Sequence, residues 1–424
     1  MACSRLELHR AVATAALAAL LCWTGAGCEL SASGNDEPQA RAGADQTVAA
    51  GAQVTLDGSA STDADGDALT YAWTQTGGPG VALTGANTAQ ATFSAPAGSA
   101  VLTFLLTVDD GHGGTDSDTV TITVEAATTS RLYVANLIGN SVVGFVDPGL
   151  LDGNVAPDAV LSGTATELAN PADVVVIGEA LAVANFGADS ITVYSNAETA
   201  HGNEAPRSIV AGANSQLVDP TSLAVDAARD LLYVADVTGA DRIMRYAGAS
   251  LPAFGGDVAP ASVITSADLS NPFGVCLAGD ELYVANNATN RVAVYARPWT
   301  LAGEVAATRV IRCSSFSGIY DVFVDSSDRM YVVGSVADRV SILEDASTLN
   351  GLVTPTAELT VPGAGTLTSV VVASDGTGYL VDRSLNRVYA YSSLATRDGT
   401  VAPDRTIEGG STLLNGPVRA YLDE

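Results

Sequence analysis

Short runs in which apolar and polar residues alternate dominate the chain from about residue 38 onward. Examples are the runs at 53–56, 70–73 and 119–124, the last of which reads Thr-Val-Thr-Ile-Thr-Val. Alternation with a period of two predicts β-strands that bury one face. No segment between these runs has a helical period, and 42 glycines supply tight turns. The pattern therefore predicts an all-β protein.

The first thirty residues follow a different pattern. Arg5 and Arg10 precede an apolar run at 11–23, and small residues then lead to Cys28. As a helix this run would measure about 20 Å, too short to cross a hydrocarbon core of about 30 Å. The run therefore predicts a cleaved signal peptide at 1–27.

The small residues that end in a cysteine resemble the lipobox of bacterial lipoproteins. This resemblance implies that cleavage leaves Cys28 as the lipid-bearing first residue, with the polar segment 28–37 as a tether. Gly25 stands where that motif usually has Leu, so simple secretion stays open as the alternative. The expected location is the bacterial cell envelope, lipid-anchored in the outer membrane or in the periplasm.

Residues 38–126 contain about seven short strands and one tryptophan, Trp73, which predicts a β-sandwich of two sheets. The segments that closely resemble the polycystic kidney disease (PKD) repeat family are 54–61, 63–67, 69–73 and 106–111. The resemblance implies an Ig-like extracellular sandwich that acts as a spacer or adhesive module rather than as a catalyst.

One cluster in this segment has the residue types of a metal site. Asp63, Asp65 and Asp67 alternate along the chain, and carboxylate oxygens at this spacing can converge on Ca²⁺. A complete EF-hand-type loop would also need a Glu near position 74 or 75, where this chain has Thr74 and Gln75. Two interpretations stay open: a calcium site, or a turn in which Asp side chains accept hydrogen bonds from nearby backbone. No other cofactor is expected.

From 127 to 424 the chain repeats itself. A strand of the type Leu-Tyr-Val-Ala-Asn occurs six times, at spacings of 48 to 51 residues. The copies lie at 132–136, 181–185, 232–236, 282–286, 330–334 and 378–382. Each copy has an apolar strand before it and another strand after a short turn. A second motif also recurs in each repeat; its first copy is Asn-Val-Ala-Pro at 154–157. This motif precedes a short outer strand, so each repeat holds four strands.

Six four-stranded units of about 50 residues predict a six-bladed β-propeller. The first repeat lacks an inner strand, whereas the segment 414–423 after the last repeat aligns with the missing strand. We therefore expect the C-terminal strand to complete blade one and close the ring. The repeats resemble NHL-type propellers. This resemblance implies the fold and not the activity, because such propellers include lyases, lactonases and binding platforms.

The inner strands of a propeller line its axis. Their alignment places six small or polar residues there, in ring order from blade one: Arg419, Asp173, Ser222, Gly274, Asp321 and Ser369. A metal-dependent lactonase similar to the gluconolactonase family would need three or four acidic or amide ligands, but the two acids stand on blades two and five. Arg419 is expected to pair with Asp173 on the adjacent blade. We expect a polar ring satisfied by its neighbours and water, with an axial metal site as the alternative.

Charge narrows the set of partners. The chain has 47 Asp and Glu against 19 Arg and no Lys, which gives a formal net charge of −28. Nucleic acid is not expected as a partner, since clustered cations are needed to bind phosphates. Contact with the membrane is expected through the lipid anchor only. The 3 histidines are so placed that we expect no Ser-His-Asp set.

These observations favour a surface-anchored or periplasmic binding or scaffold lipoprotein. Its propeller would bind a protein or glycan partner, its PKD-like domain would act as a spacer, and the molecule would be a monomer. The alternative is a propeller enzyme, lyase or lactonase-like, with an axial site. Such an enzyme would carry unusual acids, His or a long insertion in one blade.

Two cysteines remain in the mature fold once the signal is removed and Cys28 is acylated. Cys276 is expected on the innermost strand of blade four, and Cys313 at the end of the outermost strand of the same blade. That placement separates them by roughly 14 Å, against the less than about 7 Å that a disulfide spans. We expect two free thiols, with Cys276 buried and inert and Cys313 slowly reactive near the rim.

Overall fold

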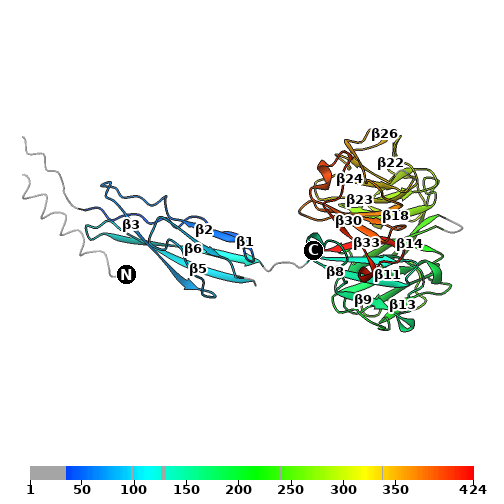
Figure 1. Ribbon diagram of the computed structural model, residues 1–424, viewed down its shortest axis with the longest axis horizontal. Coiled ribbons are helices and arrows are strands. Elements are labelled where there is room, and N and C mark those ends of the chain that lie inside the picture. Colours follow the sequence, from blue (N-terminus) through cyan, green and yellow to red (C-terminus); the bar gives the residue numbers. More distant parts are fainter. Residues whose placement is uncertain (1–34, 97–98, 126–129, 238–240, 337) are drawn as a thin grey trace, which may run out of the picture. The chain divides into compact units, whose positions relative to one another are not determined.

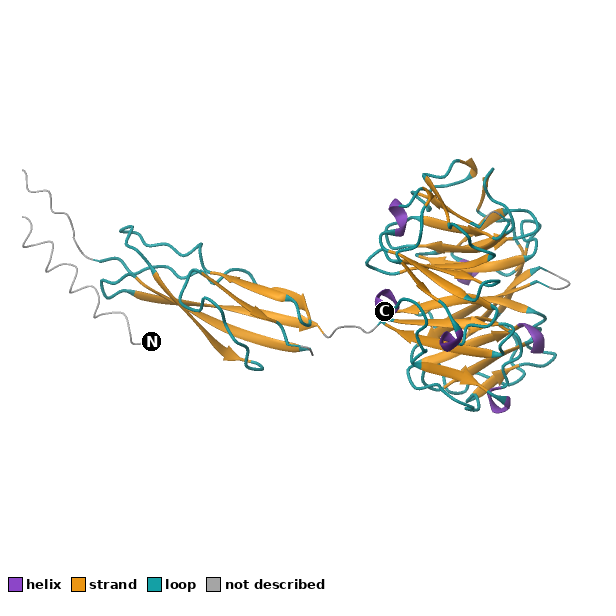
Figure 2. Ribbon diagram, viewed as in Figure 1, coloured by secondary structure: helices purple, strands orange, loops and turns teal. Residues whose placement is uncertain are grey.

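The computed structural model describes residues 35–424, apart from 97–98, 126–129, 238–240 and 337. The predicted signal peptide, Cys28 and most of the tether lie outside the described residues. Strands and short 3-10 helices make up the regular structure (Figure 2), and the all-β prediction is confirmed. Within the described ranges, no helix is long and apolar enough to cross a membrane. The chain divides into two compact units, Met1–Thr128 and Thr129–Glu424.

The first unit is a β-sandwich (Figure 1). Its described strands are β1 (Gln46–Ala49), β2 (Gln53–Asp57), β3 (Thr70–Gly77), β4 (Gln90–Ser94), β5 (Ala100–Asp109) and β6 (Thr115–Glu125). One sheet has the order β1-β6-β5-β3, and β2 pairs with β4 in the other. Burial alternates along β2 and β5, as a period of two predicts. Trp73 lies in the core, and its indole N–H donates to the carbonyl of Thr88 (3.2 Å).

The second unit is a six-bladed β-propeller, as predicted from the repeats. From blade one to blade six, the inner strands are β33 (Pro417–Asp423), β10 (Pro171–Ile177), β14 (Pro220–Asp226), β18 (Pro272–Ala278), β23 (Ile319–Val324) and β28 (Leu367–Val372). The second strands are β7 (Arg131–Asn136), β11 (Ala180–Asn185), β15 (Leu231–Asp236), β19 (Glu281–Asn286), β24 (Met330–Gly334) and β29 (Gly378–Asp382). The third strands are β8 (Ser141–Val146), β12 (Ser190–Tyr194), β16 (Arg242–Ala247), β20 (Arg291–Ala296), β25 (Arg339–Leu343) and β30 (Arg387–Tyr391). The outer strands are β9 (Ala159–Ser162), β13 (Ser208–Val210), β17 (Ser262–Thr265), β22 (Arg309–Cys313), β27 (Ala357–Thr360) and β32 (Arg405–Ile407).

The C-terminal strand closes the ring, which confirms the prediction. β33 pairs antiparallel with β7, so that Arg419 lies opposite Ala135 in blade one. β33 also contacts β10 and β28, the inner strands of blades two and six. Every inner strand therefore has an inner-strand neighbour on each side, and no blade ends the ring.

Blade strands are buried on both faces, unlike the strands of the sandwich. β11 and β12 are buried at every position, because each sheet packs between two others. At the junction of blades three and four, for example, Tyr233 and Ala235 share a hydrophobic cluster with Leu282 and Val284.

The blades are also joined at their outer rim, which the sequence pattern alone does not predict. At the start of the recurring motif that precedes each outer strand (154–157 in blade one), a glycine pairs in parallel with the outer strand of the preceding blade. These glycines, all at φ between 72° and 78°, are Gly153, Gly202, Gly256, Gly303, Gly351 and Gly399. In three blades the pairing extends into short strands, β21 (Gly303–Glu304), β26 (Gly351–Val353) and β31 (Gly399–Thr400). Glycine is required because other residues adopt this backbone conformation only with strain.

Candidate functional site

The strand register places the six predicted axial residues at equivalent positions. Each directly follows an irregularity at the start of its inner strand. The members of this set, called the axial ring below, are Arg419, Asp173, Ser222, Gly274, Asp321 and Ser369. The five with side chains are at most 5% exposed. Their surroundings therefore decide whether the axis can carry chemistry.

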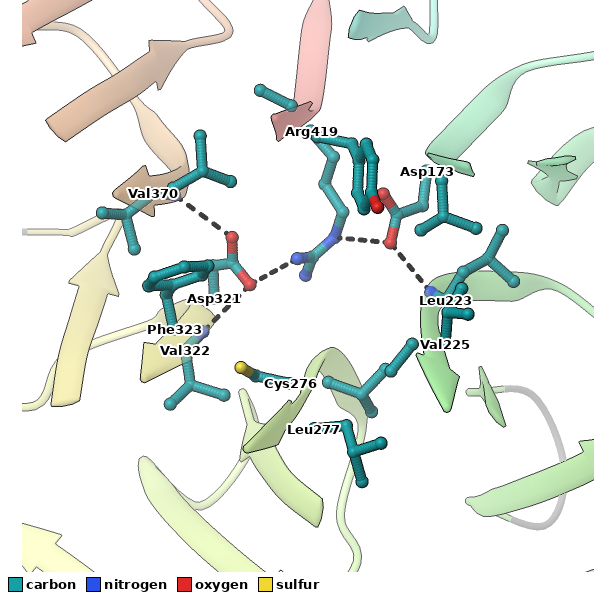
Figure 3. A pocket seen from close by; sticks show the side chains of 16 residues that line it. Asp173, Leu223, Val225, Cys276, Leu277, Asp321, Val322, Phe323, Val370 and Arg419 are labelled. Carbon is teal, nitrogen blue, oxygen red and sulfur yellow. Dashed lines mark hydrogen bonds and ion pairs between the residues drawn. The ribbon is translucent and has the colours of Figure 1, made fainter. Parts of the chain in front are cut away.

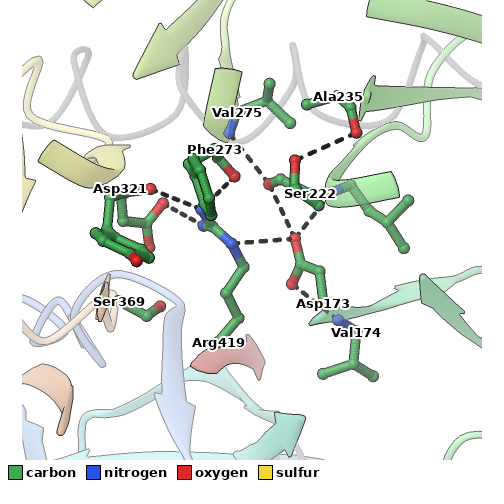
Figure 4. A network of polar contacts seen from close by, with 12 residues as sticks. Asp173, Val174, Ser222, Ala235, Phe273, Val275, Asp321, Ser369 and Arg419 are labelled. Carbon is green, nitrogen blue, oxygen red and sulfur yellow. Dashed lines mark hydrogen bonds and ion pairs between the residues drawn. The ribbon is translucent and has the colours of Figure 1, made fainter. Parts of the chain in front are cut away.

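Arg419 lies between the two acids of the ring (Figure 4). Its Nη1 pairs with Asp321, and its Nε lies 3.8 Å from Oδ2 of Asp173. Its Nη2 donates to the carbonyl oxygens of Phe273 (2.7 Å) and Tyr320 (2.8 Å). Arg419 therefore pairs with both acids and approaches Asp321 more closely, whereas the sequence predicts pairing with Asp173 on the adjacent blade.

Gly274 leaves the space that the guanidinium occupies. A Cβ atom at this position would lie 2.8 Å from Nη2 of Arg419 and 2.8 Å from Oδ1 of Asp321. Such distances are shorter than van der Waals contact, so a larger residue would displace the guanidinium or the carboxylate. Arg419 can therefore extend across the axis because blade four has a glycine at this position.

Four ring side chains bond their blade to the next one by accepting a main-chain N–H. The donor–acceptor pairs are Leu223–Asp173, Val275–Ser222, Val370–Asp321 and Ala420–Ser369, at 2.8 to 3.3 Å. The repeated position therefore serves to join neighbouring blades.

Gly274 and Arg419 have no side-chain oxygen that could accept a main-chain N–H of the next blade. In both cases the next blade supplies the acceptor itself. The blade after each of them carries an Asp, whose Oδ1 accepts from the N–H of the residue that follows it. Asp173 accepts in this way from Val174 (2.8 Å), and Asp321 from Val322 (2.9 Å). Asp can accept both hydrogen bonds because it has two oxygens. Hydrogen bonding therefore accounts for both acids, and no ring side chain has a buried unpaired polar atom within the described residues.

Electrostatics agrees with this closed arrangement. Burial raises the pKa of Asp173 to about 6, although Arg419 acts in the opposite direction. Burial lowers the pKa of Arg419, but the carboxylates of Asp321 and Asp173 outweigh this effect and hold it above its ordinary value. A guanidinium bound by two acids leaves neither acid free to bind a metal or to exchange protons with a substrate.

A cavity of about 190 Å³ lies on the axis beside the ring (Figure 3). From the ring it extends along the inner strands toward their C-terminal ends, past Val175, Cys276, Phe323 and Tyr421. Aside from the ring itself, the named walls are largely apolar. The cavity therefore offers volume but few groups that could orient a polar substrate.

The two cysteines differ from their expected exposure. Both are free thiols, separated in the sheet by β19 and β20. Cys276 lines the axial cavity and is partly exposed, whereas Cys313 is 8% exposed and packs in the cluster between blades four and five. The expectation that Cys276 is the more buried thiol is wrong, because its side chain faces the axis and not a neighbouring blade. Burial nevertheless raises the pKa of Cys276 to about 12.

The three Asp residues of the sandwich lie close together, with carboxylate oxygens within 4.8 Å of one another. Oδ1 of Asp63 accepts from the main-chain N–H groups of Asp65 (2.9 Å) and Asp67 (3.1 Å), as in the turn interpretation. Asp67 lies 3.1 Å from Nδ1 of His112, and Asp65 accepts from the N–H of Asp36 (2.7 Å). Oδ2 of Asp63 has no hydrogen-bond partner within the described residues. The hydrogen bonds to Asp63 support the turn interpretation, and its unpartnered Oδ2 is compatible with the calcium interpretation.

Exposed apolar side chains gather at one end of the axis. We call the face at which the inner strands begin the entry face; it also carries the turns between second and third strands. Ile138, Val336 and Leu385 lie in these turns in blades one, five and six, which are neighbours in the ring, and are 62%, 73% and 40% exposed. Leu413, in the connection into the inner strand of blade one, is 50% exposed. These four residues form the apolar entry patch.

The three turn residues of the patch occupy similar places. Each lies against a glycine in the connection that leads into the inner strand of its own blade. The pairs are Ile138 with Gly416, Val336 with Gly318, and Leu385 with Gly365. The patch was not predicted from the sequence, because the repeat pattern selects buried positions; an apolar residue inside a polar turn is the signal that could have found it.

A second cavity, of about 430 Å³, lies between blades six and one. We call it the seam cavity; it lies on the exit face, where the inner strands end. Its chemistry-bearing lining residues are Asp147, Asp375, Tyr379, Arg405 and Glu424, together with Gly149. Burial raises the pKa of Tyr379 to about 12, and the three carboxylates act in the same direction. This cavity is the more polar of the two.

Comparison with known proteins supports the PKD resemblance. Residues 42–124 match a family model described as a PKD domain. The solved PKD domain of the KIAA 1837 protein is 35% identical, with 23% of this chain and 94% of that chain covered and a TM-score of 0.19. No curated protein matches the chain.

Two other solved structures are similar over a larger share of the chain. A Bacteroides caccae protein of unknown function is 8% identical, with 69% of this chain and 98% of that chain covered and a TM-score of 0.49. A chain of the nidogen/laminin complex is 12% identical, with the same shares covered, 69% and 98%, and a TM-score of 0.46. The propeller fold rests on the strand pairing described above and not on these likenesses.

Proposed function

We propose that this chain is a binding or scaffold lipoprotein of the bacterial cell envelope. A lipid on Cys28 would hold it at the membrane, and the PKD-like sandwich would act as a spacer. The propeller would bind a protein or glycan partner through its entry face. The observation that carries this proposal is the apolar entry patch, because apolar side chains on adjacent blades gain free energy when a partner removes them from water.

The axial ring favours binding over catalysis. A lyase or lactonase with an axial site needs an acid or base within reach of its substrate. Asp173 and Asp321 instead accept main-chain hydrogen bonds and pair with Arg419. The apolar character of the entry patch supports a protein partner in preference to a glycan, which would need polar groups and aromatic faces.

The test compares two multiple variants of the full chain. Ile138→Ser, Val336→Ser and Leu385→Ser together remove three of the four patch residues, whereas Leu251→Ser and Leu352→Ser remove exposed apolar residues elsewhere on the propeller. Each protein is immobilised, and partners from an envelope extract are quantified by mass spectrometry alongside binding to a glycan array. We expect the patch variant alone to lose its partner. Equal recovery by wild type and patch variant would refute the role of this face.

A further inference from the structure

The seam cavity contains more acid than the chain itself neutralises. Three carboxylates, those of Asp147, Asp375 and Glu424, line it together with one cation, Arg405. Arg405 donates through Nη1 to the carbonyl of Gly149, which fixes it to the wall of the cavity. A single guanidinium held in this way leaves an excess of negative charge.

The hydroxyl of Tyr379 opens onto the same cavity. Tyr379 is 3% exposed and lines the cavity, and its hydroxyl has no hydrogen bond within the described residues. At the equivalent strand position, Tyr283 and Tyr331 donate to Glu281 and Asp325, both at 2.9 Å, whereas the buried hydroxyls of Tyr133 and Tyr233 have no partner within the described residues. A hydroxyl that faces a cavity without a protein partner can donate to or accept from a ligand bound there.

The junction of blades three and four shows how this chain fills the equivalent space. There the 3-10 helix η4 (Pro298–Thr300) corresponds to η1 (Pro148–Leu150) beside the seam cavity, and both begin with Pro. Trp299 stands where η1 has Gly149, and its carbonyl accepts from Arg245 as that of Gly149 accepts from Arg405.

A cation from the chain itself occupies that junction. The guanidinium of Arg229, from the turn between the inner and second strands of blade three, lies 3.5 Å from the Trp299 ring centroid. It pairs with Asp226 (3.0 Å) and Asp280 (3.4 Å). The corresponding turn of blade six has Asp375 and Gly376. At the seam cavity, therefore, Gly149 stands in place of the tryptophan and leaves open space, and the turn that would carry the cation has the acid Asp375 instead.

We propose that the seam cavity binds an organic cation, an ammonium or guanidinium group, through the carboxylates of Asp147, Asp375 and Glu424 and the hydroxyl of Tyr379. The ligand takes the place that Arg229 takes at the junction of blades three and four. A free amine or a Lys or Arg side chain of a partner supplies this group. The site lies on the exit face and does not depend on the entry-face proposal.

The probe for this site is agmatine, which carries one guanidinium and one ammonium group. Its binding to the full chain is measured by isothermal titration calorimetry at low and physiological salt. We expect binding that weakens as salt rises, since the carboxylates are partly open to solvent. Asp375→Asn should weaken binding about tenfold, as expected for a charge-assisted contact, and Tyr379→Phe should weaken it several-fold.

Two further variants sharpen the test. Gly149→Trp restores the side chain of η4 and should abolish binding; if it fails to fold, Tyr379→Phe and Asp375→Asn decide alone. Asp280→Asn removes an acid at the junction of blades three and four, and should leave agmatine binding unchanged. Absence of binding, equal affinity in the Tyr379 and Asp375 variants and wild type, or Ca²⁺ that competes with agmatine for the site would each overturn the assignment.

Discussion

Replacing Arg419 with Met tests whether the axial ring is an architectural element. The substitution keeps an unbranched side chain and removes the guanidinium. Asp173 and Asp321 then lose their shared cation while they remain buried, and the carbonyls of Phe273 and Tyr320 lose a donor. Removing one partner of a buried ion pair costs about 3 to 5 kcal/mol, because the other charge is left uncompensated.

This cost is large enough to measure by thermal unfolding. At roughly 2 to 4 °C per kcal/mol for a domain of this size class, the propeller should melt about 10 °C lower. The measurement is the propeller transition in differential scanning calorimetry at pH 8. Arg312→Met, which removes an exposed guanidinium from β22, is the matched control and should leave the transition within about 2 °C of wild type.

The pH dependence gives a second, independent readout. The pKa of Asp173 is raised from its ordinary 3.8 to about 6, so the folded state binds this proton more tightly than the unfolded state. The stability gained from that proton is fully present below about pH 4 and is lost as the pH rises through about 6. Without Arg419 the pKa of Asp173 rises further, so the deficit of the variant should be smaller at pH 5 than at pH 8.

A compensating variant separates lost charge pairing from lost packing. Asp173→Asn and Asp321→Asn, combined with Arg419→Met, remove the buried charges but keep only one acceptor oxygen each for the two main-chain N–H groups, so part of the lost stability should return. An Arg419→Met protein that melts like wild type, or a deficit that is the same at pH 5 and pH 8, would refute the ion-pair account.

Four further predictions follow from the fold and the predicted anchor. Deleting 413–424 removes β33 and leaves blade one without its inner strand, so the protein should aggregate or melt well below the intact chain; unchanged melting would contradict closure. Cys276 should react only slowly with a small neutral maleimide at pH 7, because its raised pKa leaves little thiolate, and rapid labelling in mass-spectrometric footprinting would contradict its burial. Cys28→Ala should release soluble protein from cells, and a variant that still fractionates with membranes would rule out the lipid anchor. Asp63→Ala should lower the melting temperature of the sandwich equally with and without EDTA, whereas a calcium-dependent stabilisation of wild type that this variant lacks would favour the calcium site.

Features that repeat along the chain were predictable, because each repeat tests the same interpretation again. The spacing of the second strands indicated six blades, and the segment 414–423 indicated closure by the strand now seen as β33. Alignment on the inner strands was also enough to bring Asp173 and Asp321 to the same level of the axis. In these cases local pattern and global fold agree, and the sequence is sufficient.

Contacts that depend on a missing side chain were not predictable in the same way. Arg419 reaches Asp321 because Gly274 leaves its path open, and an alignment that places Gly274 on the axis does not show which side chain fills the space. The rim pairing of Gly153 and its counterparts was not predicted, because positive φ is not visible in a sequence. The exposure of Cys276 and Cys313 was reversed for a related reason, since strand assignment does not say which side chains face open space.

Equivalence among the blades also bears on where a ligand can bind. Polar residues that recur at the ring join each blade to the next, so their recurrence is explained without a substrate. Asp173 and Asp321 differ from the Ser and Gly residues at the other ring positions. Each lies in the blade that follows a ring residue without an acceptor: Asp173 follows Arg419, and Asp321 follows Gly274. A departure from six-fold equivalence that the neighbouring blades do not compensate is therefore the better sign of a binding site. The seam cavity is such a departure: Gly149 replaces the tryptophan of η4, and the turn that carries Arg229 in blade three has Asp375 and Gly376 in blade six.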